Sequence, residues 1–174
     1  LLPILSMHYS PEHFGVLSVV SGGATFLICF FTLRLELAVF IENNEGQIKA
    51  LISVVVFLII FIAGALLLGG KFILELINVE SFNRIAEWWI LIVLAGALQS
   101  FILLGNSCNN RNGNYFNISI SRVGQTVIFY SMAIIFAYID NFSLNLIISF
   151  LISYVLIAVF IEYKNNLFWV FITE

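Results

Sequence analysis

A long apolar stretch, Phe14 to Ile41, limits the possible folds of this chain more than any other feature. As a single helix, its twenty-eight residues would extend about 42 Å, at about 1.5 Å per residue. The hydrocarbon core of a bilayer is only about 30 Å thick, so such a helix is long enough to cross it. The stretch therefore predicts a membrane-spanning helix, with Arg34 and Glu36 inside the helix and near one membrane face.

Composition favours a membrane protein over any soluble class. Hydrophobic residues make up 61% of the chain and charged residues 10%, and the mean hydropathy is +1.08, whereas a soluble domain carries about 25% charged residues. The net charge of −3 and the absence of a basic run argue against nucleic acid as a partner. Two cysteines and two histidines form neither a disulfide framework nor a metal-ligand cluster, so we expect no metal and no cofactor.

Further apolar stretches, separated by polar or turn-forming residues, extend the prediction to an all-α, polytopic membrane helix bundle. Its five complete spans are expected at residues 14–41, 48–70, 88–105, 122–139 and 144–161. The polar segments 71–87 and 106–121 are predicted to be connections. Residues 1–7 and 167–174 resemble elements cut short, so we expect a fragment with partial spans at both ends.

Orientation follows from the basic residues in alternate connections. Five lie in one set (Arg34, Lys49, Arg111, Arg122 and Lys164), and the other set contains only Lys71 and Arg84. Because short cytoplasmic loops carry an excess of lysine and arginine, we predict that the first set is cytoplasmic.

Two predicted spans carry a stripe of small or polar side chains at helical spacing. The first comprises Ser18, Gly22, Thr25, Cys29, Thr32 and Glu36, and the second comprises Ser119, Arg122, Thr126, Tyr130, Ala133 and Ala137. Each stripe has two interpretations: close packing between helices, or a wet interior face ending in a charge. Arg122 could equally snorkel to the membrane surface. Arg34 lies about 200° from Glu36, so a straight helix cannot direct both into one cavity.

Other residues inside the spans favour helix packing. Gln99, near the middle of its span, more often bonds a neighbouring helix than a substrate. The pairs Gly22-Gly23 and Gly69-Gly70 are typical of packing or kink sites, and Ser149 and Ser153 lie one turn apart for close packing.

Motifs of soluble catalysis are absent from the sequence. It contains no GxSxG, HExxH, P-loop or CxxC pattern. We therefore expect a protein that is not an enzyme.

Two groups of residues resemble a known family. The segment SPEHFG (residues 10–15), followed by an apolar span and then by RLELAV (residues 34–39), is similar to the start of the bacterial polysaccharide and O-antigen flippases. These belong to the multidrug/oligosaccharidyl-lipid/polysaccharide exporter superfamily. Gln99, Asn110-Arg111, Tyr115-Phe116 and ISRV (residues 120–123) resemble that family's fourth helix, cytoplasmic loop and fifth-helix opening.

The resemblance implies part of the N-terminal six-helix lobe of a two-lobe transporter. Such proteins move an undecaprenyl-pyrophosphate-linked oligosaccharide across the bacterial cytoplasmic (inner) membrane by alternating access, for surface polysaccharide biosynthesis. The implied partners are that lipid-linked oligosaccharide, membrane lipids and a coupling ion, either a proton or sodium. Arg34 and Glu36 match the family's R-x-E pattern, and Arg122 matches the cation that opens its fifth helix. The loop around Arg111 departs from the pattern, since asparagine replaces most of its usual cations.

The predicted substrate-binding residues are Arg34, Glu36, Gln99, Arg122 and Thr126. Three alternatives stay open. Another exporter of the same superfamily would carry lipid II or drugs in the same fold. A membrane-embedded polysaccharide enzyme would need a base beside a large polar loop, and the longest outside loop contains no histidine. A helical scaffold is disfavoured by charges on small-residue helix faces.

Overall fold

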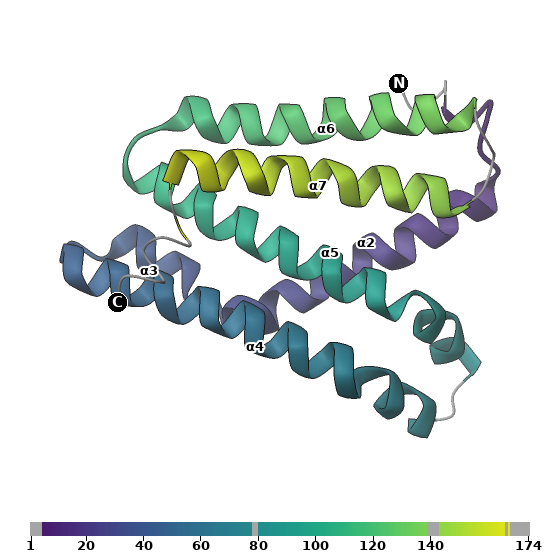
Figure 1. Ribbon diagram of the computed structural model, residues 1–174, viewed down its shortest axis with the longest axis horizontal. Helices are drawn as coiled ribbons and strands as arrows, with labels where there is room; N and C mark the ends of the chain where they lie inside the picture. Colours follow the sequence, from purple (N-terminus) through teal and green to yellow (C-terminus); the bar gives the residue numbers. More distant parts are fainter. Residues whose placement is uncertain (1–4, 78–79, 139–142, 166, 168–174) are drawn as a thin grey trace.

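The protein is a bundle of six helices in a computed structural model (Figure 1), which describes residues 5–77, 80–138, 143–165 and 167, with the side chains of 71–86 excluded. The helices are α2 (Pro11–Thr32), α3 (Glu36–Ile41), α4 (Glu45–Ile77), α5 (Glu80–Arg111), α6 (Tyr115–Ala137) and α7 (Ser143–Asn165). No strand occurs among these residues, which confirms the all-α prediction. The expected partial elements 1–7 and 167–174 lie mostly outside the described residues.

Five helices in the described part of the chain are long and apolar enough to cross a membrane. They are α2, α4 over Glu45–Gly70, α5 over Glu87–Arg111, α6, and α7 from Leu144. Consecutive spans run in opposite directions, so residues 33–45, 111–115 and 165 lie at one end of the bundle (Figure 1). The chain is thus a multi-pass membrane protein. The connections at this end are the ones predicted to be cytoplasmic from their basic residues.

Helix α5 is the centre of the bundle. It contacts α2, α3, α4, α6 and α7, and it runs between α4 and α7 in Figure 1. Its side chains Ile92, Val93 and Leu104 are fully buried in the main apolar core. Every other described helix is therefore positioned relative to α5.

Glycines allow α5 to approach its neighbours closely. A side chain on Gly96 would meet Phe31 of α2 at 2.9 Å and the carbonyl oxygen of Ala24 at 3.2 Å. A side chain on Gly105 would collide with Ile161 of α7. Close packing of this kind holds membrane helices together, because lipid tails remove the hydrophobic drive between them.

A second, smaller core joins α2 to α6 and α7. Leu5, Tyr9, Ala133, Ala137 and Leu146 form it. The Tyr9 hydroxyl donates a hydrogen bond of 2.9 Å to the carbonyl oxygen of Ala133 on α6. Burial raises the pKa of Tyr9, so its hydroxyl keeps the proton that this bond requires. The contact anchors the start of α2 beside the end of α6.

Two predicted connections are mostly helical. Helix α5 continues to Arg111 and α6 begins at Tyr115, so only residues 112–114 separate them, with Gly113 at a φ of 69°. Likewise, α4 extends to Ile77 and α5 begins at Glu80. The segments predicted as connections over 106–121 and 71–87 are therefore much shorter than expected.

Hydrogen bonds between α5 and α6 explain why the asparagine-rich segment is helical. The Ser121 hydroxyl donates to Oδ1 of Asn106 at 3.0 Å, and Nδ2 of Asn117 donates to Oδ1 of Asn109 at 3.4 Å. The asparagine side chains thus bond across the helix pair. The Ser121 hydroxyl also lies 2.8 Å from the Ile118 carbonyl oxygen of its own helix. The helices lengthen because the bonds stabilise the extra turns.

Substitution of Gly96 by valine tests the central crossing. We expect Gly96→Val to lower the free energy of unfolding by about 1–3 kcal/mol, because the new side chain overpacks a buried contact. Denaturation in mixed micelles would measure the change. Gly22→Val is the matched control, since nothing lies within 4 Å of a side chain built there. Equal destabilisation of the two variants would contradict the role of Gly96.

Candidate functional site

The helix is interrupted between α2 and α3, at residues 33–35, whereas a single helix was predicted over 14–41. Leu33 and Arg34 adopt φ angles of 47° and 61°, in the left-handed region. The Thr32 hydroxyl donates to the Ile28 carbonyl at 3.1 Å and accepts a hydrogen bond from the Arg34 backbone N–H at 3.3 Å. Such conformations are unfavourable by about 1–3 kcal/mol for residues other than glycine, and they concentrate at functional sites. The prediction of one continuous helix is therefore wrong.

The break separates the two charges of the R-x-E pattern. Arg34 lies in the break itself and is exposed, whereas Glu36 begins α3 and is only 1% exposed. Neither carboxylate oxygen of Glu36 has a hydrogen-bond partner among the described residues. A buried carboxylate in this condition is expensive, and it is a candidate for function rather than stability. The two residues therefore have different surroundings.

A groove lined by both polar and apolar side chains, here called the polar groove, lies between α2, α6 and α7 at the other predicted stripe. Its volume is about 250 Å³, and its lining residues are Leu17, Ser21, Gln125, Thr126, Phe129, Tyr130, Phe150 and Ser153. Arg122 is exposed on α6 one turn before Thr126. On α2, Ser18 and Thr25 are exposed one turn to either side of Ser21. Hydroxyl and amide groups from three helices thus surround one hollow beside a cation.

The hydroxyl groups around this groove donate their protons within their own helices. Thr126 donates to the Arg122 carbonyl at 3.0 Å, Thr25 to the Ser21 carbonyl at 2.8 Å, and Ser18 to the Phe14 carbonyl at 2.8 Å. Each oxygen keeps lone pairs that can accept a further hydrogen bond. The groove therefore offers acceptors to a ligand rich in hydroxyl groups.

The two interpretations of each stripe were close packing between helices and a wet interior face, and the exposure of the side chains shows where each can apply. Ser18, Gly22, Thr25 and Cys29 are exposed, so this part of the α2 stripe packs against no described helix, and only Thr32 and Glu36 are buried. On α6, Ser119, Arg122 and Thr126 are exposed while Ala133 and Ala137 are buried. Each stripe thus has an exposed polar part and a buried part.

Gln99 lies apart from the polar groove. It is half-buried on α5, and its Oε1 atom has no hydrogen-bond partner among the described residues. The amide was predicted to bond a neighbouring helix, and its oxygen makes no such bond to a described residue. By contrast, the buried Ser149 and Ser153 pack within the bundle as their spacing predicts.

The structure brings together only part of the predicted set. Of the predicted residues, only Thr126 lines the groove. Arg122 lies one turn before it on α6, and Arg122, Arg34, Glu36 and Gln99 are not among the lining residues. The sequence analysis placed Tyr130 on the same stripe as Thr126, but it missed the lining residues Ser21 and Gln125 and assigned Ser153 to helix packing alone. Gln125 could have been found by the same signal as Gln99, since both are amides within an apolar span.

Comparisons with protein-family models, curated proteins and solved structures gave no match. The resemblance to the polysaccharide flippases therefore stays a prediction.

Replacement of Glu36 by methionine tests the burial of the carboxylate. We expect Glu36→Met to raise the free energy of unfolding by about 1–3 kcal/mol, because it removes two buried oxygens that lack partners. Thermal unfolding in detergent would measure the change. Glu45→Met, at an exposed position in the first turn of α4, is the control and should change stability by less than about 1 kcal/mol. A loss of stability in Glu36→Met alone would mean that a group binds the carboxylate.

Proposed function

We propose that this chain forms part of a membrane flippase that moves a lipid-linked oligosaccharide across the bacterial cytoplasmic membrane. The observation that carries the proposal is the polar groove between α2, α6 and α7, with exposed Arg122 beside it. The described residues that line this groove include no pair of a nucleophile and a base. Transport requires only movement of the substrate and no covalent step.

The polar face indicates contact with water, because polar and charged side chains are unfavourable against lipid. A cation exposed to lipid on a spanning helix is unfavourable, by about 2.5–3.5 kcal/mol at the bilayer centre and less toward its surface. Arg122 lies at the start of the third turn of α6, toward the predicted cytoplasmic surface. Together with exposed Ser18 and Thr25, it gives the lobe a face better suited to a water-filled cavity than to acyl chains. The resemblance supplies an opposing lobe for that cavity.

The chemistry of the face suits the proposed substrate. A guanidinium group can bind two phosphate oxygens at once, which suits Arg122 to a pyrophosphate. The acceptor oxygens of Ser21 and Thr126 suit sugar hydroxyl groups. Rocking of the two lobes would expose this face to each side of the membrane in turn. Glu36 is the candidate for the coupling ion, a proton or sodium, because it is buried without a described partner.

One observation favours a second candidate within the same superfamily. Leu17, Phe129 and Phe150 line the groove beside its polar groups. Apolar side chains beside polar groups suit amphiphilic compounds, so an exporter of drugs or lipid II is the alternative. Its fold would be the same, and only its substrate would differ.

Labelling of the natural cysteines tests whether the α2 face is wet. Cys29 is exposed on the α2 stripe, and Cys108 is buried on α5. The cysteine thiolate attacks the methanethiosulfonate sulfur and releases methanesulfinate, and the thiolate forms in water and not in hydrocarbon. We expect a charged methanethiosulfonate to modify Cys29 in native membranes and to leave Cys108 intact, as judged by mass spectrometry. Labelling of Cys29 only after solubilisation would contradict the wet face.

Substitution of the two arginines tests transport. We expect Arg122→Ala to reduce flipping of an undecaprenyl-pyrophosphate-linked oligosaccharide at least tenfold in proteoliposomes, because the loss of one charge-assisted contact is worth about 1.5–3 kcal/mol. Arg122→Lys should restore part of the activity, since lysine keeps the charge but not the planar fork. Arg34→Ala is predicted to reduce flipping as well.

Lys49→Ala is the matched control, because Lys49 is an exposed cation at the same end of the bundle. Normal flipping by either arginine variant, at equal membrane insertion, would remove that residue from the site. Flipping of a drug or lipid II in preference to the oligosaccharide would favour the alternative exporter.

A further inference from the structure

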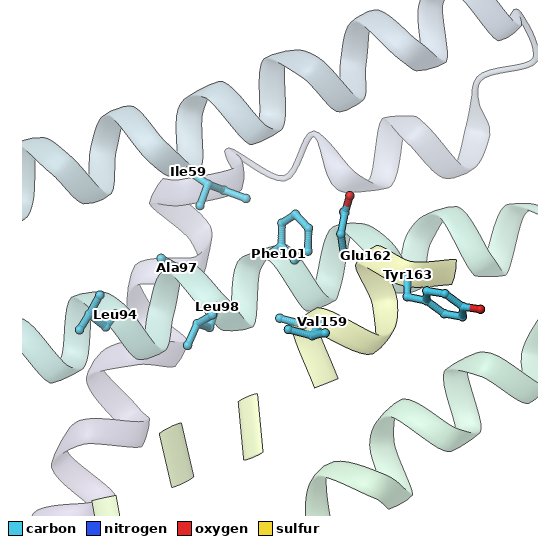
Figure 2. Close-up of a pocket in the computed structure, with 9 residues that line it drawn as sticks. Ile59, Leu94, Ala97, Leu98, Phe101, Val159, Glu162 and Tyr163 are labelled. Carbon is cyan, nitrogen blue, oxygen red and sulfur yellow. The ribbon is translucent and has the colours of Figure 1, made fainter. Parts of the chain in front are cut away.

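A second groove, outside the polar one, lies between α4 and α7 with α5 beneath it. One part of it is an open apolar hollow of about 510 Å³, lined by Ile59, Leu94, Ala97, Leu98, Phe101, Ala158, Val159, Glu162 and Tyr163. Figure 2 shows Leu94, Leu98 and Phe101 along α5, with Ile59 of α4 on one side and Val159 of α7 on the other. Between spanning helices, an apolar hollow of this size suits a hydrocarbon chain.

A charged pocket lies further along the same helices, toward the predicted cytoplasmic end. Its volume is about 220 Å³, and its polar lining residues are Arg111, Asn112, Asn114, Lys164 and Asn165. Val39, Ile48, Ile52, Cys108 and Leu167 complete the lining, so the described residues contribute two cations and no carboxylate. The pocket is therefore suited to an anion.

The two hollows follow one face of each helix. On α5, Phe101 of the apolar hollow and Cys108 of the charged pocket lie seven residues apart, and so do Ile59 and Ile52 on α4. Seven residues are two helical turns, about 10.5 Å, which returns a side chain to the same face. The charged pocket thus lies about two helical turns beyond the apolar hollow, on the same faces of α4 and α5.

We propose that this groove binds an anionic phospholipid, with the phosphate in the charged pocket and an acyl chain in the apolar hollow. The Nε of Arg111 donates a hydrogen bond of 3.3 Å to the Glu42 carbonyl, which restricts the orientation of the guanidinium group. Its terminal nitrogens carry four further N–H donors. Lys164 is exposed on the opposite wall and adds the second charge.

The charge of the pocket and its position along the membrane normal support a lipid ligand rather than a soluble anion. The cations lie where anionic headgroups gather, at the end of the bundle predicted to be cytoplasmic. Glu162 and Tyr163 line the near end of the apolar hollow, and the Tyr163 ring lies 5.6 Å from Nζ of Lys164. Glu162 already interacts within the chain. The site does not depend on the proposed transport function, because none of its lining residues lines the polar groove.

Native mass spectrometry of the purified protein tests the proposal. We expect dioleoyl phosphatidylglycerol to be retained more strongly than dioleoyl phosphatidylcholine, since the chains are the same and only the headgroup charge differs. Arg111→Gln and Lys164→Gln should each weaken retention of phosphatidylglycerol about fivefold, and together about thirtyfold, at about 1 kcal/mol per cation. Ala97→Phe should weaken it as well, by filling the apolar hollow.

Lys49→Gln is the matched control, because Lys49 is exposed on α4 at the same end but does not line the pocket. It should leave retention unchanged, and thermal unfolding would confirm that each variant is folded. Equal retention of the two lipids, or full retention by the folded double variant, would overturn the proposal. Binding of inorganic phosphate with no effect of Ala97→Phe would overturn it too, since it would reveal a soluble anion as the ligand.

Discussion

Close contact between α5 and its neighbours is the interaction on which the bundle depends. Lipid tails are as apolar as leucine, so helices in a membrane gain little from hiding apolar side chains from one another. They gain instead from dense packing, which Gly96 permits against α2 and Gly105 permits against α7. The glycines therefore determine where α2 and α7 can pack against α5. The positions of these helices in turn determine where the polar groove and the apolar groove lie.

The same packing determines which polar groups are left over. Backbone N–H and carbonyl groups are satisfied inside the helices, and the serine and threonine hydroxyls around the polar groove return their protons to the preceding turn. The carboxylate oxygens of Glu36, by contrast, have no hydrogen-bond partner among the described residues. Its burial makes the bundle less stable than an apolar residue would, so stability alone does not account for a carboxylate at that position.

Apolar length predicted the five spans because the bilayer imposes it, and the structure confirms that architecture. The helix ends were harder to predict. Asparagines 106 and 109 read locally as loop formers, but partners on α6 keep them helical. The break at Leu33 and Arg34 carries no glycine or proline, so no local signal marks it. Exposure of the α2 stripe was also unpredictable, since periodicity identifies a face and not what covers it.

Helix α7 links the two grooves. Phe150 and Ser153 face the polar groove, whereas Ala158, Val159, Glu162 and Tyr163 face the apolar hollow. At about 100° per residue, these two sets lie on opposite sides of the helix. A phospholipid and a transported substrate would thus contact opposite faces of α7. Coupling between them would require α7 to occupy two positions that each ligand stabilises differently, since a ligand with equal affinity for both shifts nothing.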